Sequence, residues 1–318
     1  MSLTINKSGF MTTVQDLGRV GYRKYGVPRS GAMDTWALEL ANITLGNPKD
    51  SACLEITLIG PTIEFNQNTL ICICGGKFSA TLNQQSLWNG KIYPVSKGDI
   101  LKMDRAFTGC RAYIAVKGGI QIQQVLKSSS TYMTSGFGGL HGRSLQPGDT
   151  LFFQPCSEKR SKWRLSSSLF HYLGTAELRL IRGNHFDDFS TSSQIQLFTS
   201  QFQVTSDSNR MGYRLNGDSL HLKQENHYST EGITIGSIQV PPSGEPIVLM
   251  SDAQTTGGYP KIAHIVSADL RILAQKKPHD LLTFIEVDWE EAFKINQELQ
   301  LEQKLVTSSI HRKKEIFK

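Results

Sequence analysis

Several features that define large protein classes are missing from this sequence. Its apolar runs are far shorter than the roughly 20 residues that a membrane-spanning helix needs, so no membrane partner is predicted. The N-terminus has no basic region followed by an apolar core, so we expect no signal peptide and a cytoplasmic location. There are only five cysteines and no Cys-x-x-Cys pair. We therefore predict buried, reduced thiols and no metal site.

Common catalytic and nucleotide-binding motifs are also missing. The sequence has no complete P-loop, because Phe78 follows Gly75-Gly76-Lys77 where a hydroxyl residue is required. It has no Gly-x-Ser-x-Gly nucleophile elbow. No lysine stands between two methionines, the usual context of biotin attachment, so any biotin would be carried by another protein.

The positive charge is moderate and concentrated at one end. The formal net charge is +6, and Arg312, Lys313, Lys314 and Lys318 supply much of it. No nucleic-acid-binding motif accompanies this tail, so we interpret it as a solvated chain end and predict no nucleic-acid partner.

Many short apolar runs separated by turns indicate a mainly β protein. The chain of 318 residues is long enough for two domains. Three similar turns, at residues 97–99, 147–149 and 278–280, each precede an apolar strand, which is typical of small β-barrels. We predict a barrel-like domain at 1–160, a serine-rich linker around 155–175, and a second barrel at 175–287. Residues 288–318 are predicted to form a helix and a basic tail.

Local signals predict individual elements. A helix is expected from Asp34, its N-cap, to Leu45, and another from Asp288 to Lys304 with an apolar stripe that docks on the barrel. Strands are expected at 54–59, 69–74 and 77–82, and Asn89-Gly90 indicates a hairpin turn.

Three glycine loops carry a cation and are candidates for binding an anion. They lie at 117–119, 136–143 and 256–261. Consecutive backbone N–H groups in such loops bind anions, and a fixed cation stabilises developing negative charge. The segment 254–261 is the richest in polar groups, and its two glycines indicate a positive φ or a close backbone approach. It is either a long structural loop or a binding loop for an anionic or amide-bearing molecule.

Other charged groups have a structural and a functional interpretation. Arg210 and Arg214 share a face at their spacing, and either grip a ligand or form surface salt bridges. Asp16 and Arg19 bind substrate or brace the N-terminal loop. Ser30 begins a stretch that brings a helix N-terminus to an anion or only caps the helix.

Six motifs, in order along the chain, carry a resemblance to a known family. They are Thr13–Arg19, Gly26–Asp34, Arg111–Ile120, Gly136–Gly139 with its following Gly-Arg and Gly-Asp pairs, Ser208–Leu215, and Gln239–Pro242. Together with Gln254–Lys261 they resemble the C-subunit family of bacterial ATP-dependent 5-oxoprolinase. This family is also called allophanate hydrolase subunit 2 or the KipA family, and it is similar to half of the urea carboxylase carboxyltransferase domain.

The resemblance implies a fold, an activity and partners. It implies two cyclophilin-like β-barrels and a hydrolase that acts with the 5-oxoprolinase A and B subunits, of which B is KipI-like. That complex uses ATP, with Mg as a possible companion, to open the ring of 5-oxoproline to glutamate. One alternative is half of a biotin-dependent carboxyltransferase, and another is a non-enzymatic regulator that binds a kinase inhibitor.

The resemblance and the residue chemistry together give a set of site residues. We predict catalytic roles for Lys261, Tyr259 and Arg210, with Lys261 an exposed cation. The predicted substrate-binding residues are Gln239, Gln254, Thr255, Thr256, Gly257, Gly258, Arg214, Asp16, Arg19 and Ser30. The chain departs from the family pattern at Ser129, where an arginine is common, and at His279, where a glycine is usual.

Overall fold

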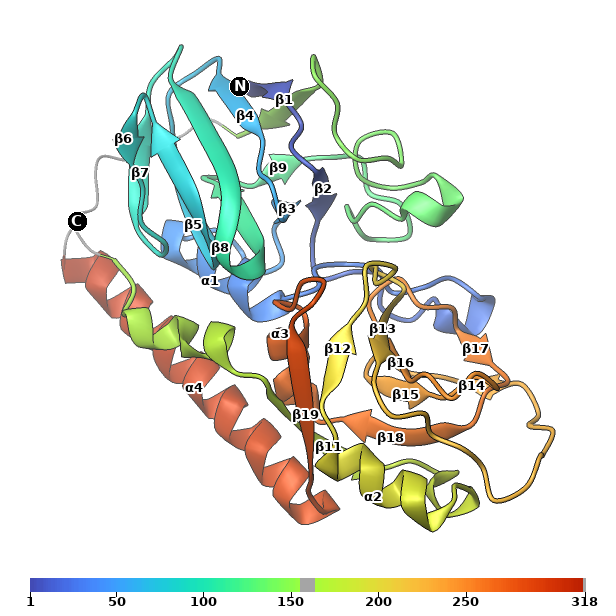
Figure 1. Ribbon diagram of the computed structural model, residues 1–318. Coiled ribbons are helices and arrows are strands. Elements are labelled where there is room, and N and C mark those ends of the chain that lie inside the picture. The colour runs from blue at the N-terminus through green and yellow to red at the C-terminus, as the bar shows by residue number, and fades with distance from the viewer. Residues whose placement is uncertain (155–163, 317–318) are drawn as a thin grey trace. The chain divides into compact units, whose positions relative to one another are not determined.

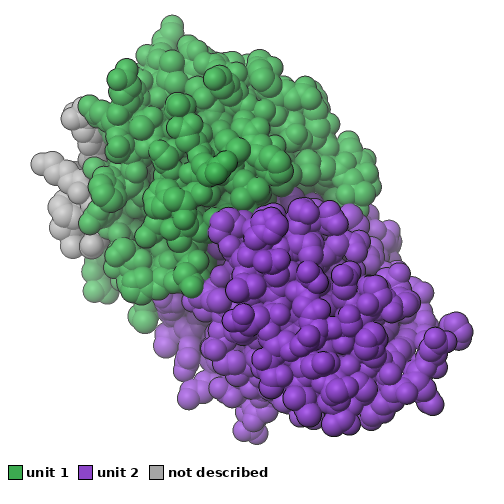
Figure 2. All heavy atoms as spheres, in the orientation of Figure 1, with its two compact units in different colours: residues 1–19, 30–174, 304–318 green, residues 20–29, 175–303 purple. Residues whose placement is uncertain are grey.

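Two compact units make up the chain in the computed structural model. The structure describes residues 1–154 and 164–316, with side chains described as far as Arg312. Unit 1 contains residues 1–19, 30–174 and 304–318, and unit 2 contains residues 20–29 and 175–303 (Figure 2). Part of the predicted linker, at 155–163, and the basic side chains from Lys313 onward lie outside the described residues.

Unit 1 is built on one curled ten-stranded sheet (Figure 1). Its strands are β1 (Ser2–Lys7), β2 (Met11–Gln15), β3 (Cys53–Thr57), β4 (Thr62–Phe65), β5 (Thr69–Leu82), β6 (Gln85–Ser86), β7 (Ile92–Val95), β8 (Ile100–Val116), β9 (Ile120–Gln121) and β10 (Thr150–Phe153). The main path is β2-β3-β8-β4-β1-β10-β9, and β5 adds β6 and β7 beside β8. Alternating apolar residues of these strands form one buried core, as the period of two requires.

Helix α1 (Thr35–Leu45) packs against β5 and β8. As predicted, the Asp34 side chain caps it by accepting a hydrogen bond from the Ala37 N–H, and Gly46 ends it in the left-handed conformation. Nine of its eleven residues are buried, which makes the helix a core element and not an amphipathic surface helix.

Two sequence predictions about β5 were wrong. The strands expected at 69–74 and 77–82 form one continuous strand, whose register shifts between Gly75 and Lys77. Asn89-Gly90 is a turn, but it joins β6 to β7, which pair separately with β5. The hairpin turn lies instead at Asn83-Gln84, where both residues have positive φ. Asn89 donates to the carbonyl of Gly75 and supports the irregular part of β5.

Unit 2 contains a closed barrel of seven strands in the order β11-β18-β15-β16-β13-β12-β19. These are β11 (Glu177–Arg182), β12 (Phe202–Val204), β13 (Gly212–Asn216), β15 (Ser237–Gln239), β16 (Ile247–Leu249), β18 (Lys261–Ile265) and β19 (Leu281–Glu286). A separate two-stranded antiparallel sheet pairs β14 (Glu231–Gly232) with β17 (Thr256–Gly257). The predicted mainly-β class with two barrel-like units is confirmed, with the sheet of unit 1 curled into a half-barrel and that of unit 2 closed.

The helices of unit 2 are short except for the last. They are α2 (Thr191–Thr199), α3 (Leu270–Leu273) and α4 (Trp289–Ile316), of which residues 289–303 belong to unit 2 and the rest to unit 1. Unit 2 also has 3-10 turns at Arg23–Tyr25, Phe186–Asp188 and Ser267–Asp269. Unit 1 has 3-10 turns at Met133–Ser135 and Ser167–Gly174. Helix α4 is longer than predicted. Its stripe of Ala292, Ile295 and Leu299 packs on residues of the barrel, as expected.

The three predicted turns share one geometry. Gly98, Gly148 and His279 all have positive φ, and the aspartate that follows each accepts a hydrogen bond from the N–H three residues earlier. His279 therefore occupies a left-handed position that normally favours glycine.

Four of the five cysteines lie in described residues, and all four are free and buried. The sulfurs of Cys72 and Cys74 lie 3.8 Å apart on one face of β5, as the strand period predicted. Within the described chain, no helix is long and apolar enough to cross a membrane.

Candidate functional site

Lys261 is the first residue of β18. The prediction that it is exposed was wrong, because the side chain is buried. It is 5% exposed. Its Nζ lies 2.9 Å from Oε1 of Glu231 on β14 and donates to the carbonyl of Gly232 at 3.3 Å. A lysine ammonium loses its hydration when buried, so it needs such a counter-ion and acceptor. Lys261 therefore anchors β14, one strand of the two-stranded β14–β17 sheet, to the barrel.

His185 joins the same cluster from the loop after β11. Its Nδ1 accepts a hydrogen bond from the backbone N–H of Lys261 at 3.0 Å, so in the neutral ring the proton is on Nε2. Nε2 lies 3.8 Å from Glu231 Oε1, and the ring packs edge-on against Tyr228. The backbone thus fixes the tautomer, and Glu231 lies near both a cation and an imidazole N–H.

The two glycines of the binding loop were predicted to provide positive φ or close approach. Neither has positive φ, but Gly257 does allow a close approach. A Cβ there would lie 2.8 Å from Nε2 of Gln239. Gln239 is buried and donates to the carbonyl of Tyr259, so it fixes the backbone of this loop from the interior of the barrel unit.

The other predicted residues of this loop are at least partly accessible. Gln254, Thr256 and Gly258 are exposed, and Thr255 is half-buried with its carbonyl accepting from the N–H of Ile233. Of the predicted catalytic residues, Tyr259 is 47% exposed and reaches a cavity.

This unit 2 cavity has a volume of about 710 Å³. Its wall combines apolar and polar groups; it includes Phe189, His221, Glu225, His227, Tyr228, Pro241, Gly258 and Tyr259. Apolar walls with a few convergent polar groups are typical of small-molecule sites. The sequence predictions missed the segment 221–228. Its cluster of two histidines, a tyrosine and a glutamate was the available signal.

One tyrosine and one histidine of unit 2 have shifted pKa values. Burial, then the adjacent Asp188 carboxylate, raises the pKa of Tyr228, whose hydroxyl donates to that carboxylate. Burial, then the charge of Lys261, lowers the pKa of His264. Both groups are therefore held in their neutral forms, as hydrogen-bonding groups and not charges.

The predicted arginine pair is separated by the fold. Arg210 is 3% exposed and forms a bidentate ion pair with Asp252, with nitrogen–oxygen distances of 2.8 and 3.1 Å. Arg214 lies on β13 and is exposed. Neither arginine is among the residues that line the cavity. Arg210 forms its ion pair inside the unit, away from solvent.

The predicted residues of unit 1 form a different arrangement. Asp16 is buried, and its Oδ1 accepts hydrogen bonds from Gly18 N–H and from the hydroxyls of Ser128 and Ser130. Its Oδ2 accepts the Ser129 N–H at 2.5 Å. Asp16 thereby holds the loop 128–131 as well as its own loop, and its role in substrate binding stays a prediction.

Arg19 lies in the same network. It is 1% exposed, donates from Nη2 to the Ser130 carbonyl, and stacks over the Phe137 ring with its central carbon 4.7 Å from the ring centroid. A Cβ at Gly138 would collide with both the Ser130 carbonyl and Arg19, so this glycine permits the packing.

The helix N-terminus after Ser30 is occupied by the protein's own groups. Glu55 accepts from the Met33 N–H and from the Tyr113 hydroxyl, and that hydroxyl in turn accepts from the Asp34 N–H. Ser30 itself is buried with φ 53°, and its hydroxyl has no partner within the described chain. The predicted anion position is thus filled by a buried carboxylate.

The other two glycine loops also use their donors internally. The N–H groups of Gly118 and Gly119 donate to Asn47 Oδ1 and the Val116 carbonyl, and Lys117 Nζ donates to the Leu45 carbonyl. In the loop 136–143, Arg143 forms a bidentate pair with Asp149. In both loops the cation is therefore already paired within the protein.

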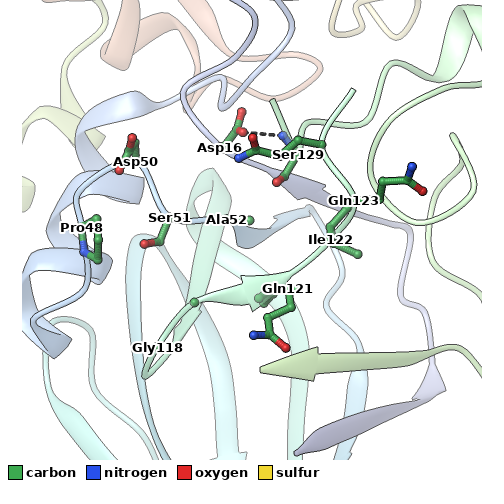
Figure 3. A pocket seen from close by; sticks show the side chains of 13 residues that line it. Asp16, Pro48, Asp50, Ser51, Ala52, Gly118, Gln121, Ile122, Gln123 and Ser129 are labelled. Atoms are coloured by element: carbon green, nitrogen blue, oxygen red, sulfur yellow. Dashed lines mark hydrogen bonds between the residues drawn. The ribbon is translucent and has the colours of Figure 1, made fainter. Parts of the chain in front are cut away.

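Unit 1 nevertheless has a cavity of about 540 Å³ beside Asp16 (Figure 3). Asp16 and Ser129 lie at one side of it, with Asp50, Ser51, Gly118 and Gln121 among the other lining residues. In the described residues, no group of three or more histidine, cysteine, aspartate or glutamate side chains is arranged to hold a metal ion.

Comparison with known proteins defines the family. The model of the carboxyltransferase domain, subdomains A and B, matches residues 25–286. The chain belongs to this family. Among members of the carboxyltransferase family, the 5-oxoprolinase C subunit of Escherichia coli is 39% identical over 94% of this chain and 95% of its own length. The C subunit of Haemophilus influenzae 5-oxoprolinase is also 39% identical, over 91% of this chain and 92% of its own length.

The family also includes parts of much longer proteins. Urea amidolyase of Saccharomyces cerevisiae is 33% identical over 91% of this chain but only 17% of its own length. The crystal structure of Kluyveromyces lactis urea amidolyase matches with a TM-score of 0.89 and 30% identity, over 97% of this chain and 20% of that one. This chain therefore spans about a fifth of the solved urea amidolyase chain.

Proposed function

We propose that this chain is the C subunit of an ATP-dependent 5-oxoprolinase and works with other subunits in opening the 5-oxoproline ring to glutamate. The observation that carries this proposal is the end-to-end match to the E. coli C subunit, which includes 95% of that protein. The match to yeast urea amidolyase involves 17% of that protein, so it supports only the second candidate given below.

The unit 2 cavity is the part of this chain that best suits the substrate. Its apolar wall fits the methylene carbons of a small lactam, and Tyr228, Tyr259 and His227 offer polar contacts. The cluster of Lys261, Glu231 and His185 is joined to the loop that carries Tyr259, because Lys261 follows this loop directly in the chain. We infer that this cluster positions the loop and that Tyr259 contacts substrate.

Nucleotide binding is assigned to the assembled complex and not to this chain alone. The sequence contains no complete P-loop. In the complex, ATP would supply the driving force for amide opening, and this chain would hold the lactam or complete its site.

Reconstitution tests the proposal. The purified chain alone should hydrolyse no ATP in response to 5-oxoproline, and addition of the A and B subunits should create that activity. Tyr259→Phe should weaken substrate use by about 10-fold, on the order of one hydrogen bond at the transition state, while Tyr25→Phe, an exposed tyrosine outside the cavity, should not. Turnover by the single chain would refute the division of labour.

The second candidate is a biotin-dependent carboxyltransferase half, which the family match and the urea amidolyase structure favour. It predicts incorporation of labelled bicarbonate that depends on a biotinylated partner and urea. Activity of the reconstituted complex in the absence of bicarbonate and biotin would exclude it.

A further inference from the structure

The cavity of unit 1 has a chemical character opposite to that of an anion site. Asp16 and Asp50 line it, together with three glutamines and Ser129, and no arginine, lysine or histidine is among its lining residues. The N–H groups of Gly118 and Gly119 at its edge are already bonded to Asn47 and Val116. A negatively charged ligand would therefore meet acceptors and no cation.

The hydrogen bonds of Asp16 leave one acceptor position open. Oδ1 accepts three bonds, whereas Oδ2 accepts only the Ser129 N–H. A carboxylate oxygen has capacity for about two donors, so Oδ2 keeps room for another. Since Asp16 is 7% exposed and held by four donors, this oxygen is fixed in place before any ligand arrives.

Ser129 provides an independent indication of a ligand. It is 6% exposed, its N–H is bonded to Asp16, and its carbonyl accepts from the Gly139 N–H. Its side chain lies in the cavity wall beside Asp16 (Figure 3). Within the described residues, its hydroxyl forms no hydrogen bond. This hydroxyl is not among the fully buried side-chain polar atoms without a partner in the described chain, so it is open to a ligand that enters the cavity.

We propose that this cavity binds a small organic ligand that presents N–H donors and has no negative charge, such as an alkylguanidinium, a primary ammonium or an uncharged amide. Its N–H groups would donate to Asp16 Oδ2, and a second polar atom would bond to the Ser129 hydroxyl. The exposed side chains of Asp50 and Gln121 would add weaker contacts at the rim. This binding is independent of the reaction proposed for unit 2.

Titration of three matched probes tests the inference. Methylguanidinium, 2-pyrrolidinone and acetate are added separately to the full-length chain, and binding is followed by the amide NMR signals of Ser129 and Gly119. We expect saturable shifts with methylguanidinium and 2-pyrrolidinone, with Kd of about 0.1–10 mM for ligands of this size, and none with acetate. Acetate binding as tightly as methylguanidinium would overturn the proposal, as would the absence of saturable shifts with both donor probes.

Two variants make the assignment specific. Ser129→Ala should weaken binding of both donor probes by about 5-fold, the value of one hydrogen bond, whereas Ser86→Ala, an exposed serine of the same unit outside the cavity, should not. Ser129→Arg should abolish methylguanidinium binding, and an unchanged thermal unfolding midpoint would show that this variant is folded. If Ser129→Ala binds the probes as the wild type does, the cavity is not their site. If Ser129→Arg unfolds, the alanine variant still decides the question.

Discussion

Asp16 in unit 1 and Lys261 in unit 2 are both buried charges at the end of a loop, but their charges are stabilised in different ways. Asp16 is surrounded by neutral donors, namely two backbone N–H groups and two serine hydroxyls. Lys261 instead faces a counter-ion, Glu231, whose side chain is 36% exposed. A carboxylate held by neutral donors acts as a local organising centre, whereas a partly exposed ion pair depends on both partners and on solvent.

The largest predicted effect concerns Asp16. Asp16→Asn replaces one acceptor oxygen by an NH₂ group, which would face donors where it needs acceptors. We expect a loss of about 3 kcal/mol in the free energy of unfolding, since one or more buried donors become unsatisfied. The midpoint of urea unfolding measures this. The matched change Asp50→Asn, at an exposed carboxylate, should lie within about 0.5 kcal/mol of wild type. Equal effects at the two positions would show that the Asp16 network is not a stabilising centre.

The next effect concerns the ion pair of unit 2. Lys261→Met should destabilise by about 1.5–3 kcal/mol, the range for a hydrogen bond to a charged group. Burial of Lys261 is the reason for this size, since an exposed surface cation would contribute only about 0–1 kcal/mol. Turnover of the reconstituted complex should also fall, because the loop that carries Tyr259 loses its anchor.

A double-mutant cycle with Lys261→Met and Glu231→Gln measures the interaction energy of the ion pair apart from the other contributions of each residue. We expect a coupling energy of about 1 kcal/mol or more between the two substitutions. Additive effects would mean that Lys261 is stabilised by the Gly232 carbonyl and the protein interior and not by Glu231.

A smaller effect on the free energy of unfolding, opposite in sign, is expected at two turns of the same geometry, one at His279 in unit 2 and one at Gly148 in unit 1. His279→Gly in unit 2 should stabilise by about 0.5–1 kcal/mol, because the left-handed conformation is strained for histidine but not for glycine. Gly148→Ala in unit 1 should destabilise by a similar amount. A Cβ there meets no atom within 4 Å, so only backbone strain is measured. Thermal unfolding of both variants would test this, and a destabilised glycine variant at position 279 would contradict it.

The smallest predicted effect is the pH dependence that His264, a residue close to Lys261, gives to the free energy of unfolding. Burial lowers the pKa of His264 in the folded protein, so the unfolded chain binds a proton more readily at this residue. The contribution of His264 to stability is complete above the unfolded pKa of about 6.5 and falls as the pH drops below it. Urea midpoints at pH 7.5 and 5.5 should therefore differ less in His264→Gln than in wild type. An identical pH dependence would show that His264 does not contribute.

The sequence by itself determined the family, the mainly-β class, the capped helix α1 and the three turns. These features depend on local rules: Asp34 and Gly46 define the ends of α1, and the Gly-Asp and His-Asp pairs mark turns before apolar strands. That His279 takes a positive φ was decided by the structure. The predicted resemblance to the 5-oxoprolinase C-subunit family is confirmed by the comparisons. The specific roles of the predicted site residues stay predictions.

Only the tertiary structure decided which predicted charges are available to a ligand. Residue type and spacing do not show that Arg210 meets Asp252, 42 residues away, or that Lys261 on β18 meets Glu231 on β14. Likewise, Asp16 receives three of its four donors from serines more than 110 residues further along the chain. A charged side chain pairs with whatever group the fold brings within about 3 Å, and that contact determines whether the charge supports the structure or remains free to bind.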